Sequence, residues 1–140
     1  MPGTSTPILP QTVKTPSVQI ANADGTTAKT IYTASANGAL ISAITVASTD
    51  GTARDLKFYV NNGTTDILLC TVQIPANSGN TNALPPVDVL RSTMCPGLAF
   101  DANGNRVIFL EAGDILKAAA GSSVTSGQTI NIVCPSVGEY

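Results

Sequence analysis

The stretch Arg54–Ala76 reads RDLKFYVNNGTTDILLCTVQIPA and contains the clearest strand signals of the chain. Its first half alternates apolar with polar side chains, which is typical of a strand with one buried face. Asn62-Gly63 then supplies a pair that favours a tight reversal. Its second half alternates again, with apolar side chains at positions 68, 70, 72 and 74. The stretch therefore predicts an antiparallel β-hairpin.

Short segments rich in Val, Ile and Thr, separated by Gly, Asn, Asp and Pro, continue on both sides of this hairpin. Such a pattern is typical of an all-β domain. We expect about eight strands in a two-sheet β-sandwich. Val18–Asn22 and Ala28–Ala34 are expected to form a first hairpin around Asp24-Gly25, and Ala39–Thr49 to be apolar on both faces. Val87–Cys95 is compatible with a short helical turn or with an irregular crossing.

The alternation also predicts which side chains lie in the core. Residues of the same parity as Leu56 and Leu68 are expected to point inward from the two strands of the hairpin. The later strands around Phe109 and Ile132 are expected to contribute further side chains to the core. The predicted core members are Leu56, Phe58, Val60, Leu68, Cys70, Val72, Ile74, Val107, Phe109 and Ile132.

Residues 1–17 differ in composition from the rest of the chain. They contain Pro2, Pro7, Pro10 and Pro16, each of which lacks a backbone N–H and fixes its φ angle. We therefore expect an extended N-terminal arm over residues 1–17, followed by a β-sandwich domain over residues 18–140. The first residues lack a basic start and an apolar run, so we expect synthesis in the cytosol without a secretion signal, and no membrane partner.

Charge is sparse along the whole chain. Of its 140 residues, 11% are charged and 43% are hydrophobic, with seven basic and nine acidic side chains spread singly. A chain of this length is expected to bury about 70% of the surface of its unfolded form in one domain. No cationic stripe is present to neutralise phosphates, so nucleic acid is not an expected partner.

The residue types present exclude most enzyme mechanisms. The chain has no histidine, which removes Ser-His-Asp and Cys-His nucleophiles, His-ligated metals and a histidine pH switch. It also has no glycine-rich phosphate loop. We therefore expect no enzyme activity, no catalytic residue, no cofactor, no metal and no small-molecule substrate. The three cysteines Cys70, Cys95 and Cys134 are odd in number and widely spaced, so we expect free, structural thiols.

Two acidic stretches allow a functional and a structural interpretation. Glu111 and Asp114 flank Gly113 in the sequence LEAGD. They could form a catalytic carboxylate pair, or they could be the solvated residues of a hairpin turn. Asp101–Asn105 reads DANGN, like part of a calcium loop, but lacks the downstream Glu that such a loop requires. A turn is the favoured interpretation in both places.

Aromatic residues give few candidates for a binding surface. The chain has no Trp, three Tyr and three Phe, which disfavours a sugar-binding module built on stacking aromatic rings. Tyr59, on the outward parity of its strand, and Tyr140, at the end of the chain, are candidate contact residues. Phe58 and Phe109 are expected in the core.

A longer block carries a resemblance to a known family. Tyr32–Leu90 reads YTASANGALISAITVASTDGTARDLKFYVNNGTTDILLCTVQIPANSGNTNALPPVDVL, and FLEAGDILKA and VTSGQTINIV follow it. In this order, over about residues 30 to 134, the chain resembles the cement, or decoration, proteins of tailed-bacteriophage capsids. The shared motifs are strand and turn signatures, so they indicate a role and no particular contact residue.

The resemblance implies a jelly-roll β-sandwich that binds the outside of an icosahedral capsid in the virion as a homodimer. Its partner would be the major capsid protein, whose neighbouring subunits it ties together after assembly in the host cytoplasm. Because charge is sparse, we expect that contact to use apolar burial and neutral hydrogen bonds. The alternative is a receptor- or glycan-binding virion module, such as a fibre or spike tip, because the same kind of sandwich displays binding loops.

Overall fold

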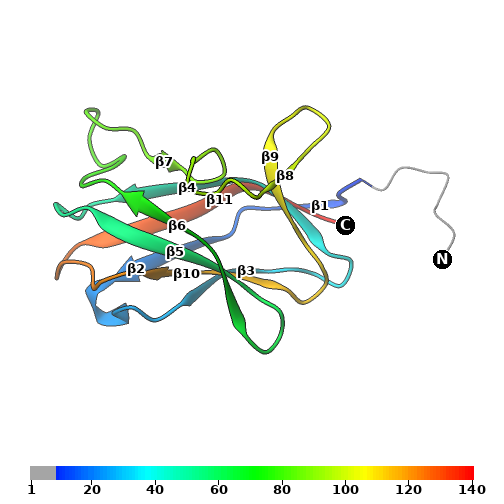
Figure 1. The fold of residues 1–140 in the computed structure, drawn as a ribbon, viewed down its shortest axis with the longest axis horizontal. Helices are drawn as coiled ribbons and strands as arrows, with labels where there is room; N and C mark the ends of the chain where they lie inside the picture. The colour runs from blue at the N-terminus through cyan, green and yellow to red at the C-terminus, as the bar shows by residue number, and fades with distance from the viewer. Residues whose placement is uncertain (1–8) are drawn as a thin grey trace, which may run out of the picture.

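The computed structural model describes residues 9–140, and residues 1–8 of the predicted arm lie outside the described residues. Two antiparallel sheets form the two layers of the molecule (Figure 1). Their strands are β1 (Thr12–Lys14), β2 (Ser17–Ala21), β3 (Lys29–Thr33), β4 (Ala39–Ser48), β5 (Arg54–Asn61), β6 (Asp66–Ile74), β7 (Val87–Asp88), β8 (Ala99–Phe100), β9 (Arg106–Leu110), β10 (Ile115–Ala120) and β11 (Thr129–Glu139).

The larger sheet has seven strands in the order β1-β11-β4-β9-β8, with β2 also pairing with β11 and β7 with β4. The smaller sheet has the order β3-β10-β5-β6. The predicted all-β, two-sheet architecture is therefore confirmed. Eight strands have five or more residues, and the sequence did not predict the short strands β1, β7 and β8.

One apolar core joins the two sheets. The larger sheet supplies isoleucines and valines from β2, β4 and β11, and the smaller sheet supplies its part from β5, β6 and β10. β-branched side chains fit this setting because they pack well on a pleated surface. Its largest fully buried members include Phe58, Ile20, Ile41, Ile44, Leu56, Ile74, Leu116, Ile130, Ile132 and Val46.

The predicted hairpin of β5 and β6 is confirmed, with Gly63 at φ +101° in its turn. A β-bulge in this pair was not predicted: Phe58 lies opposite Cys70, but the next residue, Tyr59, lies opposite Leu68. The extra residue of β6 reverses its parity, because side chains alternate faces along a strand. Leu68 therefore points outward, 54% exposed, and its predicted place in the core is wrong.

Phe109 is the second error in the predicted core. Ile108 and Leu110 of β9 lie opposite Ile41 and Ala39 and enter the core, whereas Phe109 is 56% exposed. Four consecutive apolar residues in β9 left its inward parity undefined by the sequence. The remaining predictions agree: Leu56, Phe58, Val72, Ile74, Val107 and Ile132 are buried, and Val60 and Cys70 are partly buried.

β4 has one inward face whose parity changes along the strand, so the expectation of two apolar faces is also wrong. Ala39 and Ile41 are buried near its start, and Ile44, Val46 and Ser48 are buried near its end. The register with β11 shifts on both sides of Ser136, between these two groups. The buried parity of β4 thus changes where its register with β11 shifts, and apolar residues of both parities occur along the strand.

The expected first hairpin does not form. β2 pairs with β11 in the larger sheet, and β3 pairs with β10 in the smaller sheet. The turn containing Asp24-Gly25, with the 3-10 turn Asn22–Asp24, therefore crosses between the sheets. Turn residues specify a reversal of the chain, but they do not specify which strand the returning segment joins.

The remaining segments complete the sandwich. Val87–Cys95 contains β7 followed by turns, so the irregular alternative holds. Part of the predicted arm belongs to the larger sheet, because β1 pairs with β11 and Pro10 lies over Gly138, where an added Cβ would come within 2.6 Å of the Pro10 Cβ. Within residues 9–140, no helix has the length and apolarity needed to cross a bilayer.

Candidate functional site

Glu111 and Asp114 lie at a turn between the two sheets. The Asp114 N–H donates to the Glu111 carbonyl at 3.1 Å, and Gly113 takes φ +84°, a conformation that glycine adopts without strain. Ala34 holds the turn from the side, because its N–H donates to the Asp114 carbonyl at 2.8 Å. β9 pairs with β4 and β8, and β10 with β3 and β5, so the stretch is a turn as predicted but not a hairpin. Glu111 is exposed and Asp114 is partly exposed.

Asp101 closes the turn between β8 and β9. Its carboxylate oxygen Oδ1 accepts hydrogen bonds from the N–H groups of Asn103 and Asn105, both at 2.9 Å. This is the usual way in which an aspartate stabilises a turn. The residues described contain no cluster of three or more side chains able to hold a metal ion.

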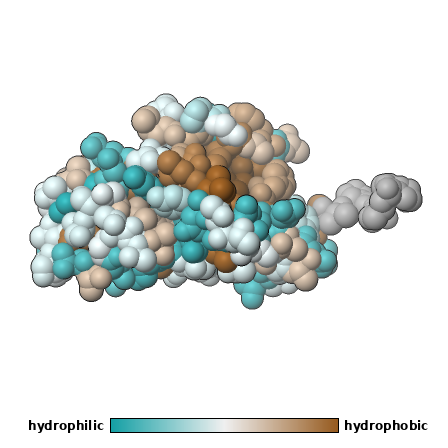
Figure 2. Space-filling view, turned by 60° about the horizontal axis from the view of Figure 1, so that its bottom comes forward, coloured by the Kyte–Doolittle hydropathy of each residue, from teal (hydrophilic) through white to brown (hydrophobic). Residues whose placement is uncertain are grey.

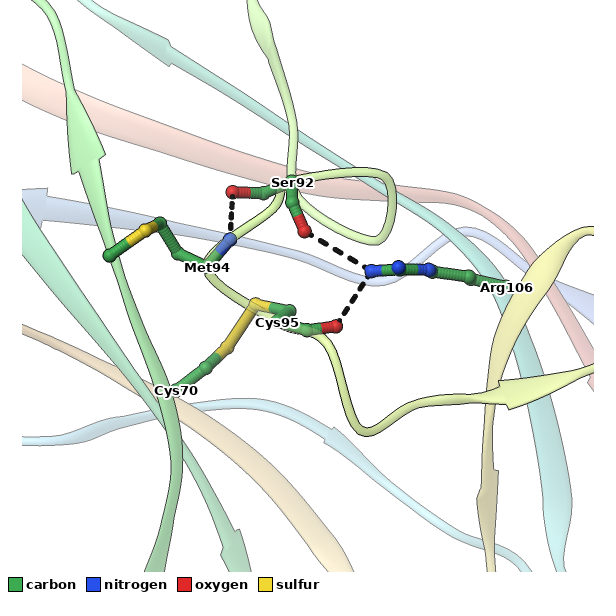
Figure 3. The surroundings of a disulfide bond; sticks show 5 residues. All are labelled: Cys70, Ser92, Met94, Cys95 and Arg106. Atoms are coloured by element: carbon green, nitrogen blue, oxygen red, sulfur yellow. Dashed lines mark hydrogen bonds between the residues drawn. A yellow bond between two sulfur atoms is a disulfide. The ribbon is translucent and has the colours of Figure 1, made fainter.

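The cysteines depart from the prediction of three free thiols. Cys70 of β6 and Cys95 of the long connection before β8 form a disulfide, with Cα atoms 5.6 Å apart (Figure 3). Sequence spacing did not indicate this pair, because the connection folds back over β6 only in the tertiary structure. Cys134 is free and buried, as predicted, and burial raises its pKa to about 12.

A polar cluster centred on Asp50 ties together the connections at one end of the sandwich. Asp50 is 1% exposed. Its carboxylate accepts hydrogen bonds from the N–H and hydroxyl of Thr125 at 3.0 and 2.8 Å, from Nε of Arg54 at 2.8 Å and from the N–H of Thr52 at 2.9 Å. Arg54 continues to the hydroxyls of Ser122 and Thr125, both at 3.0 Å. The β4–β5 and β10–β11 connections thus share one buried anion.

The electrostatics of this cluster favour the ionised carboxylate. Burial alone would raise the pKa of Asp50, but the hydrogen bonds from Thr125, Arg54 and Thr52 outweigh it and hold the pKa well below its ordinary value. Across residues 9–140, every buried side-chain nitrogen or oxygen has a hydrogen-bond partner. Because all of its polar groups have hydrogen-bond partners, we interpret the cluster as structural. The sequence signal that could have indicated it is STDGTARD, which contains Asp50 and Arg54.

A second polar contact joins the sheets near the other end. The hydroxyl of Tyr32 in β3 donates to Glu139 Oε2 in β11 at 2.5 Å. Burial, with the hydrogen bond to Glu139, raises the pKa of Tyr32 far above its ordinary value. This phenol therefore stays protonated and acts as a cross-sheet tie.

Exposed apolar side chains are a further feature of the surface. Figure 2 shows strongly apolar atoms gathered near the middle of one face, with polar side chains around them. Soluble monomers rarely display large contiguous apolar surface unless it serves an interaction. The large apolar side chains that are exposed are Leu9, Val13, Ile67, Leu68, Leu69, Leu84, Met94, Phe100, Phe109 and Val133.

The two tyrosines predicted as contact residues are only partly exposed. Tyr59 lies on the outward face of β5, opposite Leu68 and Lys117. Tyr140 donates its N–H to the Gly38 carbonyl at 3.3 Å. The sequence did not suggest Leu68, Met94, Phe100 and Phe109 as surface residues. For Leu68 and Phe109 the strand parity was misassigned, and for Met94 and Phe100 no pattern marked exposure.

No protein-family model, curated protein sequence or solved structure matches this chain significantly.

Proposed function

We propose that this chain is a structural protein of a tailed-phage virion that binds the outer surface of the icosahedral capsid and ties neighbouring major capsid subunits together. The exposed apolar side chains Leu68 and Leu69 of β6, with Met94 and Phe100, carry the proposal, because they give the sandwich an apolar surface for attachment. A cement protein needs a rigid body and a contact surface, and it needs no reactive group.

The polar contacts of the chain agree with this role. Asp50 and Tyr32 are 1% and 8% exposed, and both hydrogen-bond to partners within the molecule. The acid pair and the Asp101 turn are likewise accounted for as turns. We propose further that the sandwich has jelly-roll connectivity and binds as a homodimer, as the resemblance to cement proteins implies.

Repetition would strengthen such an attachment. An icosahedral shell presents many equivalent positions, and a fastener that bridges two subunits binds the second one at high effective concentration. Each contact can then be modest in area while the bridged lattice is firmly held. The sparse charge of the chain, 11% of its residues, favours contacts made by apolar burial and neutral hydrogen bonds.

Washing of purified particles tests this function. We expect the protein to be present in hundreds of copies per particle, to stay bound in about 1 M sodium chloride, where the Debye length is about 3 Å, and to be released in mild urea. A few copies per particle would favour the alternative of a receptor- or glycan-binding tip. Absence from particles, or release by salt with retention in urea, would contradict the proposal.

A further inference from the structure

Four exposed apolar side chains lie along the junction of β6 with the connection that precedes β8. They are Leu68 and Leu69 of β6, Met94 of the connection and Phe100 of β8, and we call them the apolar platform. Met94 and Phe100 are each 62% exposed, the highest values among the large apolar side chains of the sandwich after Val13 and Leu9.

Contacts within the chain connect β6, the segment Ser92–Cys95 and Phe100. Leu69 precedes Cys70, whose disulfide partner Cys95 follows Met94. Arg106 Nη1 donates to the carbonyls of Ser92 and Cys95 at 3.2 and 2.9 Å (Figure 3), and its guanidinium lies 5.9 Å from the centre of the Phe100 ring. The N–H of Met94 donates to the Ser92 hydroxyl at 3.2 Å. The segment that carries Met94 and Phe100 is thus held beside β6 before any partner arrives, which lowers the entropy cost of binding.

Charged side chains next to the platform have partners within the chain. Arg106 is held by the two carbonyls, and Arg91 pairs with Asp88 at 3.0 Å. Asp66 accepts a hydrogen bond from Asn61 at 2.7 Å and pairs with Lys117 at 3.3 Å. A charged partner would have to compete with these contacts and lose its hydration, whereas a neutral apolar partner would not. The charge balance of this surface therefore fits an uncharged partner.

The backbone beside the platform adds a second element of recognition. β6 is the terminal strand of the smaller sheet, so within residues 9–140 its outer edge pairs with no further strand. An edge strand presents N–H and C=O groups that an extended segment of another chain can bind. Val133, an exposed apolar residue outside the platform, instead lies inside the larger sheet, between Ser17 and Thr45.

From these observations we infer that the apolar platform and the outer edge of β6 bind an extended, uncharged, apolar segment of the major capsid subunit. This inference rests on the proposed function, because it names the surface by which the chain attaches to the shell. The segment covers Leu68, Leu69, Met94 and Phe100 and adds as a strand alongside the first residues of β6.

Binding to shells that lack this chain tests the inference. The probe is the shell of the major capsid protein of the same phage, and the readout is co-sedimentation with Leu68→Asp and Met94→Asp variants. We expect each variant to bind at least tenfold more weakly than the unchanged chain, because an aspartate carboxylate would be desolvated in the contact. Val133→Asp, at a site 39% exposed on the other sheet, is the matched control and should bind as the unchanged chain does.

The outcomes separate the two proposals. If the unchanged chain fails to bind the shell, the proposed function fails, and the platform inference fails with it. If the unchanged chain binds and both platform variants bind equally well, the platform is not the contact and the function stands. Thermal unfolding of each variant, followed by circular dichroism, should be unchanged, because both side chains lie outside the core.

A second copy of the chain is the competing occupant. Sedimentation velocity in the absence of shells measures it directly. We expect the oligomeric state of Leu68→Asp and Met94→Asp to equal that of the unchanged chain. Conversion of a dimer to a monomer by these substitutions would overturn the inference and assign the platform to self-association.

Discussion

The Asp50 cluster and the apolar platform show two opposite ways in which this sandwich treats its connections. At the Asp50 end, polar side chains are buried and every group has a partner within the chain. At the platform, apolar side chains are exposed, although a disulfide and the Arg106 contacts hold the segment in place. The first region resembles an interior and the second an interface, and we therefore propose that stability and attachment depend on separate parts of the molecule.

This difference predicts how each region responds to substitution. Changes in the Asp50 cluster should alter folding and leave shell binding unchanged per folded molecule. Changes at the platform side chains should alter shell binding and leave folding unchanged.

Asp50→Ala should have the largest effect. It would leave Arg54, with a side chain 16% exposed, and the N–H and hydroxyl of Thr125 without their anion. Breaking a buried ion pair from one side costs about 3–5 kcal/mol. Urea unfolding monitored by circular dichroism measures the loss, with Asp88→Ala, in the exposed Arg91–Asp88 pair, as the control that should change little.

The same cluster predicts the acid response of the protein. Because the folded-state pKa of Asp50 lies below its ordinary value of 3.8, its contribution is complete above that pH and is lost as pH falls toward the folded-state pKa. Unfolding free energies should therefore decrease below about pH 4, and the decrease should be smaller in Asp50→Asn. An equal acid response in both proteins would show that Asp50 does not supply it.

Removing the disulfide should have the next largest effect. The bridge closes a sequence separation of 25 residues, and a loop of this size contributes about 3 kcal/mol. Cys70→Ser/Cys95→Ser should therefore melt roughly 10 °C below the unchanged chain. A reducing agent should lower the melting temperature of the unchanged chain similarly and leave the double variant unaffected. No change on reduction, with an intact mass showing three thiols, would restore the interpretation of free cysteines.

Gly138→Ala should have a smaller effect, confined to the N-terminal segment. A Cβ at this position would come within 2.6 Å of Pro10 Cβ, so the segment before β1 would have to move away from β11. Overpacking of this kind costs about 1–3 kcal/mol. The matched control is Gly51→Ala, where nothing lies within 4 Å of the added atom. Equal melting temperatures for the two variants would show that residues 10–14 are not packed on the sheet.

Alkylation of Cys134, a free cysteine in the core, should show the smallest effect, and it reports whether the core opens. Its thiol is buried, and burial raises its pKa from the ordinary 9.0 to about 12. The reactive thiolate is therefore much scarcer at pH 8 than for a free thiol. Iodoacetamide should leave Cys134 unmodified in the folded protein and modify it in urea, as peptide mass spectrometry would show. Rapid labelling of the folded protein would mean that the core opens readily.

The sequence predicted the architecture well because alternation and turn residues are local signals. β5, β6 and the turn at Gly63 were predicted together, and Leu56, Phe58 and Ile74 were correctly placed in the core. Strand partners were harder to predict from the sequence. Asp24-Gly25 and Gly113 reverse the chain whether the next strand pairs locally or crosses to the other sheet. The bulge that exposes Leu68 depends on the register of two strands, which no single segment encodes.

The candidate site was largely beyond sequence reasoning for the same physical reason. The turns at Glu111 and Asp101 were interpreted correctly from local chemistry. Cys70 and Cys95 are distant in sequence and meet only because the connection before β8 folds over β6. The Asp50 cluster likewise requires Thr125 of another connection, at a sequence separation of 75 residues.

Amide hydrogen exchange of the protein, free and bound to the shell, tests the central claim most directly. Exchange protection reports which backbone groups a partner covers or stabilises. The account predicts that binding slows exchange in residues 66–70 and 91–100, at the platform, and leaves residues 48–54 and 122–127, around Asp50, unchanged. Protection gained around Asp50, with none at the platform, would contradict the account.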